Sequence, residues 1–148
     1  MTIGDYVSQG DVVFLEDLGR TETTKRLIEK AIESGHVADA EVFSRAIFER
    51  ESILSTAVGQ GVAVPHAKVA GIDEFFVAIG ISSTPIEWDA PDKQPVRIVF
   101  LIGGPENQQT RYLQILAKAM LVVKNEGLRT RLLGAKSAAD VMTTFSGL

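Results

Sequence analysis

Two long apolar runs place the strongest limit on how this chain can fold. They are FFVAIGI at residues 75–81 and VRIVFLI at residues 96–102. Each is far shorter than the roughly 20 apolar residues that a membrane helix needs. Strands that are apolar on both faces are typical of a sheet whose two faces are both covered by helices. The two runs therefore predict central strands between two helical layers.

Shorter patterns predict the other elements. DVVFL at residues 11–15 and VAVP at residues 62–65 have the composition of short strands, and residues 83–95 hold three of the five prolines and indicate a turn-rich excursion. Helices are predicted at residues 21–34, from Asp39 to the charged run 49–51, at about 108–124, and from Ser137 onward.

Each expected helix has one apolar face that we expect to point toward the sheet. The inner residues expected on this basis are Leu27, Ile28, Ala31 and Ile32; Val42, Phe43, Ala46 and Ile47; and Leu113, Leu116, Ala117, Met120 and Leu121. Asp39 and Ser137 are expected to cap their helices. Together the elements predict an α/β fold: a single three-layer α/β/α domain over residues 1–148, with a mixed sheet covered by helices on both faces.

Charge and composition exclude several classes of function. The net charge of −4 argues against a nucleic-acid partner or an anionic membrane surface. With no cysteine and two histidines, the chain has no thiolate or histidine-rich metal site, and no nucleotide-binding loop is present. The first 20 residues lack the basic start and apolar run of a secretion signal. We therefore expect a cytoplasmic protein without metal, cofactor or direct membrane insertion.

The segment GQGVAVPHAKV, residues 59–69, holds the best candidate for chemistry. Gly59 and Gly61 allow backbone conformations that other residues avoid, and Pro65 fixes its own φ angle, so His66 should emerge at a stiffened corner. A histidine so held could act as a nucleophile, or it could be structural and bonded to the backbone. The spacing alone leaves both open. His36 has no motif around it and is expected at a helix end or on the surface.

A longer stretch resembles a known signature. RESILSTAVGQGVAVPHAKV, residues 50–69, is similar to the active-site segment of enzyme IIA domains of the phosphoenolpyruvate-dependent phosphotransferase system (PTS), in the fructose/mannitol/nitrogen-regulatory class. That class, EIIA type 2, has an Arg-Glu pair, a Ser/Thr-rich turn, a Gly-x-Gly pair and an apolar-Ala-apolar-Pro-His run. The segment 84–106 and the following YLQILAKAM helix fit the same family.

The resemblance implies that His66 accepts a phosphoryl group from the phosphohistidine of the carrier protein HPr or a paralogue. The group would then pass to a cysteine of a IIB partner, or stay as a signal. Arg50 would stabilise the phosphate, because a guanidinium can hold two of its oxygens. Without the resemblance, the run Glu49-Arg50-Glu51 indicates a solvated helix end. No metal or nucleotide is implied.

Two positions depart from the family pattern. Ala57 stands where the family usually has glycine, and Tyr112, seven residues after Pro105, stands where it commonly has a second active-site histidine. Tyrosine can donate a hydrogen bond to phosphate but adds no positive charge. Three interpretations therefore stay open: a relay protein for sugar transport, a nitrogen-regulatory type of protein that binds partners according to phosphorylation, and a homologue that is not phosphorylated. His66 and Arg50 argue against the third.

Overall fold

A computed structural model describes residues 2–146, and a six-stranded mixed sheet forms its middle layer. The strands are β1 (Val12–Leu15), β2 (Ala57–Gly59), β3 (Val62–Ala63), β4 (His66–Lys68), β5 (Phe76–Ile86) and β6 (Val96–Gly104). Their order is β1-β5-β6-β3-β2, and β4 also pairs with β6. Val62 lies opposite Ile98 and His66 opposite Ile102, so β3 and β4 follow one another along the same edge of β6.

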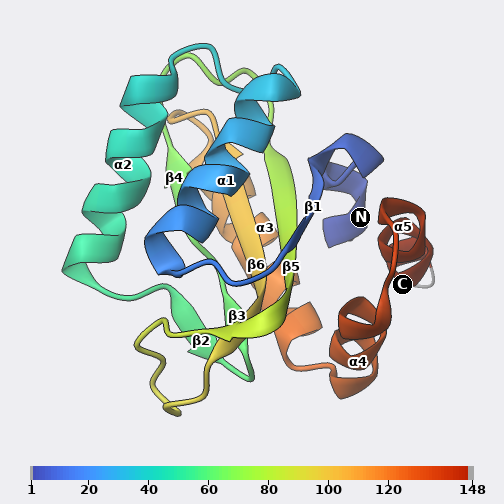
Figure 1. The fold of residues 1–148 in the computed structure, drawn as a ribbon. Coiled ribbons are helices and arrows are strands. Elements are labelled where there is room, and N and C mark those ends of the chain that lie inside the picture. Colours follow the sequence, from blue (N-terminus) through green and yellow to red (C-terminus); the bar gives the residue numbers. More distant parts are fainter. Residues whose placement is uncertain (1, 147–148) are drawn as a thin grey trace.

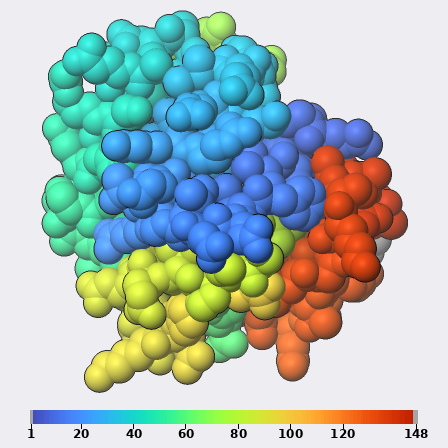
Figure 2. Space-filling view, in the orientation of Figure 1, coloured from blue at the N-terminus to red at the C-terminus, as the bar shows by residue number. Residues whose placement is uncertain are grey.

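Helices cover both faces of this sheet (Figure 1). On one side lie α1 (Arg20–Glu33) and α2 (Ala40–Ile53), which Figure 2 shows as a continuous surface over the strands. On the other lie α3 (Gln109–Val123), α4 (Glu126–Gly134) and α5 (Ala138–Ser146), with the short turn η1 (Ile3–Tyr6); a second turn, η2 (Gln9–Asp11), leads into β1. The three-layer arrangement and the mixed sheet predicted from the sequence are confirmed.

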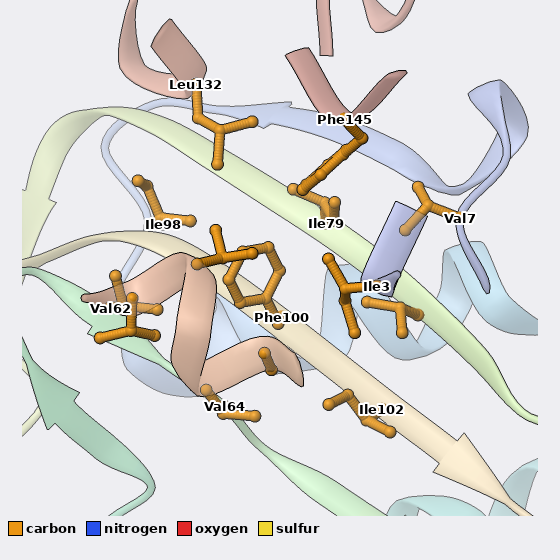
Figure 3. Close-up of a cluster of buried hydrophobic side chains, with 14 of the residues drawn as sticks. Ile3, Val7, Val62, Val64, Ile79, Ile98, Phe100, Ile102, Leu132 and Phe145 are labelled. Carbon is orange, nitrogen blue, oxygen red and sulfur yellow. The ribbon is translucent and has the colours of Figure 1, made fainter. Parts of the chain in front are cut away.

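The alternation of side chains along the central strands divides the core into two clusters. Ile98, Phe100 and Ile102 of β6 pack with α3, α4 and α5, as Figure 3 shows for part of this cluster. Val99 and Leu101 point the other way and pack with α1 and α2. All five are at most 1% exposed. Burying such a side chain fully contributes about 1.5–3 kcal/mol, so the two apolar runs account for the position of the sheet between the layers.

The expected caps are present. The Asp39 carboxylate accepts a hydrogen bond from the Val42 amide at 3.1 Å, and the Ser137 hydroxyl accepts one from the Asp140 amide at 3.2 Å. Other expectations were wrong. The strand β5 continues to Ile86, into the segment expected to be a turn, and α4, capped by Asn125, was not expected.

The predicted inner face of α3 was wrong in part: Leu116 and Met120 are half-buried and pack against the core, but the other three predicted residues are exposed. Leu113 and Leu121 are 55% and 68% exposed, and Ala117 is exposed too. The buried residues of this helix are Tyr112, Ile115, Ala119, Val122 and Val123. On the first two helices Ile32 and Val42, both expected inside, are 37% and 40% exposed. No helix within residues 2–146 is long and apolar enough to cross a membrane.

Candidate active site

His66 begins β4, directly after Pro65. We expected the strand to end at the proline, but the chain stays in the sheet. The Pro65 carbonyl accepts a hydrogen bond from the Ile102 amide at 3.0 Å, and pairing with β6 resumes at His66. The missing N–H of proline falls between β3 and β4. His66 is therefore held at the edge of the sheet by backbone pairing on β6.

The His66 ring is held in one tautomer. Its Nδ1 lies 2.7 Å from the Val64 carbonyl oxygen, which can only accept, so Nδ1 carries the proton and Nε2 keeps a free lone pair. Burial lowers the pKa of His66 below 6.5, and the nearby Arg50 charge lowers it further, against opposing effects of the Val64 hydrogen bond and Glu51. The ring is thus uncharged near neutral pH and has the electron pair that a nucleophile needs.

The three residues singled out in the sequence come together in one pocket of about 420 Å³ at the edge of the sheet, between α2 and α3. His66, Arg50 and Tyr112 all line it. Arg50 comes from the last turn of α2 and is exposed, and among residues 2–146 no carboxylate lies within ion-pair distance of its guanidinium. Its charge is therefore available to an anion in the pocket.

Tyr112 closes the α3 side of the pocket. Its ring centroid lies 5.8 Å from that of His66 at an angle of 54°, and the Phe75 ring stacks on it with centroids 6.3 Å apart. Burial raises the pKa of Tyr112 to about 12. The hydroxyl therefore keeps its proton at physiological pH and can donate a hydrogen bond but carries no charge.

Two further residues of the site were missed in the sequence. Lys68 lines the same pocket; its Nζ donates a hydrogen bond to the Gln109 side-chain oxygen and lies 5.5 Å from the centre of the Tyr112 ring. The signal was available, because residues two apart on a strand share a face and Lys68 follows His66 by two.

The other is Glu51, the residue after Arg50, whose carboxylate is buried. It accepts hydrogen bonds from Arg20 at 2.7 Å, from the Trp88 ring nitrogen at 3.2 Å and from the Thr56 hydroxyl. The charged run at 49–51 is therefore not simply a solvated helix end: Arg50 is exposed, whereas Glu51 is 8% exposed and fixes the last turn of α2.

The other features singled out lie outside this pocket. Gly59, Gln60 and Gly61 have φ angles of 91°, 59° and 76° and form the tight turn between β2 and β3. His36 follows the end of α1, as expected, but it is not simply solvated. Its Nε2 contacts the buried Asp11 carboxylate at 3.0 Å, and its ring stacks on Phe76 at 4.5 Å.

Comparison with known proteins points to one family. A sequence model of the family "Phosphoenolpyruvate-dependent sugar phosphotransferase system, EIIA 2" matches residues 8–147. A fructose-specific EIIA component of Haloferax volcanii is 34% identical over 120 residues, which are 81% of this chain and 78% of that protein. The fructose-specific EIIABC component of Bacillus subtilis is also 34% identical, over 104 residues or 70% of this chain, but the match spans only 16% of that longer protein.

Solved structures share the fold. The nitrogen regulatory protein IIA-Ntr of Neisseria meningitidis superposes with a TM-score of 0.87 at 27% identity, covering 96% of this chain and 97% of that one. The mannitol enzyme IIA of Escherichia coli, in its complex with phosphorylated enzyme IIB, superposes with a TM-score of 0.80 at 18% identity, covering 95% and 97%. The chain therefore belongs to the EIIA type 2 family of the phosphoenolpyruvate-dependent sugar phosphotransferase system.

Proposed function

We propose that this protein is a phosphoryl carrier that accepts a phosphoryl group on Nε2 of His66 from phosphorylated HPr and passes it to a cysteine of a IIB partner. The observation that carries the proposal is the hydrogen bond from His66 Nδ1 to the Val64 carbonyl. It fixes the tautomer whose Nε2 lone pair is free, in a pocket that also holds the unpaired Arg50 charge.

The transfer step balances without a metal ion or an added proton. The Nε2 lone pair of His66 forms the new N–P bond, while the electron pair of the old P–N bond returns to the donor's histidine. Each ring keeps the N–H that it had. The His66 ring becomes more positive when Nε2 is bonded to phosphorus, so its Nδ1–H bond to Val64 gains charge assistance. Such a transfer depends mainly on positioning and on stabilising charge.

Arg50 and Tyr112 have complementary roles in this proposal. The Arg50 guanidinium can hold two phosphoryl oxygens at once, which a lysine in its place could not do. Tyr112 can donate one hydrogen bond from its hydroxyl, because that group stays protonated. It stands where the family commonly has a second histidine, and it contributes no charge of its own.

Partner docking is supported by apolar side chains beside the pocket. Ile53 and Leu113 line it and are 80% and 55% exposed, and the adjacent Leu54 is 72% exposed. Large apolar residues gathered on a surface mark a contact site for another protein. We infer that HPr and the receiving protein dock here in turn, since both must reach the same nitrogen atom.

A second candidate function is a regulatory protein of the nitrogen-regulatory type, whose partners respond to the phosphorylation state of His66. The high structural similarity to IIA-Ntr, and tyrosine in place of the second histidine, favour it. The two functions share the acceptance step and differ in the fate of the phosphoryl group. Transfer of phosphate to a IIB domain separates them.

The test is phosphorylation by phosphoenolpyruvate, enzyme I and HPr. We expect one acid-labile, base-stable phosphate on the wild-type chain and none on His66→Ala, with the circular dichroism of both alike. His36→Gln is the matched control and should label normally. Arg50→Lys should label roughly ten- to a hundredfold more slowly, the loss expected for a charge-assisted contact. Label on His66→Ala would refute the assignment. Loss of the label to a IIB domain supports the relay, and its retention supports regulation.

A further inference from the structure

Lys68 lies on the same face of β4 as His66. Side chains alternate along a strand, so Ala67 between them points the other way and is buried against the α1 and α2 layer. His66 and Lys68 are both half-buried and line the pocket. Their register is fixed because they pair with Ile102 and Gly104 of β6. The backbone therefore holds the two side chains side by side.

The Lys68 ammonium group is held by neutral groups. It donates a hydrogen bond to the amide oxygen of Gln109 and lies over the face of the Tyr112 ring, 5.5 Å from its centre. Within the described residues 2–146, no carboxylate comes within ion-pair distance of it. A ring face attracts a cation without neutralising it. The lysine charge thus remains available.

The Lys68 ammonium group also lies near the start of α3, where an unpaired positive charge is unfavourable. Gln109 is the first residue of α3, and the N-terminus of a helix carries a partial positive charge. A cation there is stabilised when an anion joins it. Arg50 supplies a second unpaired charge from α2. Glu49 lines the pocket as well, so the two cations outnumber the one carboxylate among its lining residues.

We propose that Lys68 is a phosphate-binding residue: its ammonium group contacts the phosphoryl group on His66 and supplies the second positive charge of the site, beside Arg50. The inference rests on the proposed phosphorylation of His66. It also gives a reason for tyrosine at position 112. A charged imidazole there would repel Lys68, whereas the tyrosine ring attracts it. The second charge of the site then comes from β4 and not from α3.

The alternative is a purely structural role, in which Lys68 ties β4 to the start of α3 through Gln109. Two substitutions separate the roles. Lys68→Met removes the charge and keeps most of the apolar stem, and it also breaks the tie. Gln109→Ala breaks the tie and leaves the charge. Lys118→Met is the matched control, because Lys118 lies on α3 outside the pocket that holds His66.

The experiment measures the rate of phosphoryl transfer from phosphorylated HPr to each variant. A second readout is the NMR signal of the lysine ammonium groups, recorded on the wild-type chain before and after phosphorylation. We expect Lys68→Met to be roughly tenfold slower than the wild type, because it loses one partly exposed charged contact. Gln109→Ala and Lys118→Met should stay within about twofold of the wild type. Phosphorylation should shift the Lys68 signal and leave that of Lys118 unchanged.

The outcomes distinguish this inference from the proposed function. If the wild type takes no label, both are wrong. If the wild type labels and Lys68→Met labels as fast, only the role of Lys68 is wrong. The inference is also overturned if Gln109→Ala slows transfer as much as Lys68→Met, or if phosphorylation leaves the Lys68 signal in place.

Discussion

Glu51 offers the sharpest test of how the site is held together. Its carboxylate is 8% exposed and accepts hydrogen bonds from three donors that come from separate parts of the chain: Arg20, Thr56 and Trp88. Glu51→Ala removes all three bonds at once. The buried ring nitrogen of Trp88 would then lose its partner, and the Arg20 guanidinium would lose its counter-ion.

The cost can be worked from these contacts. Removing one member of a buried ion pair destabilises a protein by about 3–5 kcal/mol. The Arg20 side chain is 32% exposed and regains water, which lowers the figure, while Trp88 is 1% exposed and its unpaired N–H adds about 1–3 kcal/mol. We expect a loss of about 3 kcal/mol. Glu51→Gln should cost about 1–2 kcal/mol, since its oxygen can serve Arg20 and Trp88 while its amide donates to the Thr56 hydroxyl.

Urea unfolding measures both values. Trp88 is the only tryptophan of the chain, so its fluorescence reports the unfolding of this region, and circular dichroism reports the backbone. With an m-value of about 2 kcal/mol/M, the midpoint of Glu51→Ala should fall by roughly 1.5 M. Glu49→Ala, at an exposed glutamate of the same charged run, should change the unfolding free energy by less than about 0.5 kcal/mol. A loss below about 1 kcal/mol for Glu51→Ala, or an equal loss for Glu51→Gln, would refute the reasoning.

Two further predictions concern His66 and the glycine at the end of β6. The pKa of His66 is lower in the folded chain than in the unfolded chain, so the unfolded chain binds this proton at a higher pH. The free energy of unfolding therefore has its full value above about pH 6.5 and falls as the pH drops through the pKa of the folded chain. When the pH is lowered from 7 to about 5, the free energy of unfolding measured in urea should therefore fall more for the wild type than for His66→Gln; an equal fall would contradict this. Gly104→Ala would place a methyl group 2.2 Å from two ring carbons of Phe75, which stacks on Tyr112, so we expect a loss of about 1–3 kcal/mol and slower labelling of His66. Gly134→Ala, which meets no atom within 4 Å, should be neutral or slightly stabilising, and equal effects of the two would show that the predicted overlap is relieved without cost.

The layers of the fold could be predicted because the two long runs are apolar on both faces. A strand such as β6, whose residues from Ile98 to Ile102 are all buried, leaves few alternatives to a sheet between helices. The helix caps were predictable for a local reason, since Asp39 and Ser137 each accept a bond from an amide three residues later. Information of this kind lies within one short segment.

The face of α3 could not be predicted from its spacing. This helix is apolar on two opposite sides, one with Ile115 and Ala119 and the other with Leu113 and Leu121. Successive residues differ by about 100° around a helix, so these two pairs lie about 180° apart, and the apolar pattern alone does not show which side faces the sheet. Packing against the sheet decides between them, and that packing depends on residues far away in the sequence.

Some residues of the candidate site could likewise be predicted from the sequence and others could not. His66 was singled out by the local glycine and proline pattern, Arg50 and Tyr112 were named through a resemblance to a family, and the structure brings all three to one pocket. Glu51 was missed because its partners Arg20 and Trp88 are 31 and 37 residues away. No pattern within the charged run distinguishes its buried member from its exposed one.

His66, Lys68 and Arg50 are each held by a neighbour that does not neutralise them. His66 is oriented by a backbone carbonyl, Lys68 by an amide and an aromatic ring, and Arg50 by its place next to the anchored Glu51. For the proposed function, a site arranged in this way has its positive charge in place before a phosphoryl group arrives, which is how electrostatic stabilisation avoids a cost of reorganisation. In the proposed function, the same charges also hold the phosphoryl group after it arrives. Stronger binding of that group would raise the phosphorylated fraction and slow its donation to the next protein. We therefore expect the charges of Lys68 and Arg50 to decide whether the proposed phosphohistidine at His66 serves better as a relay or as a lasting signal.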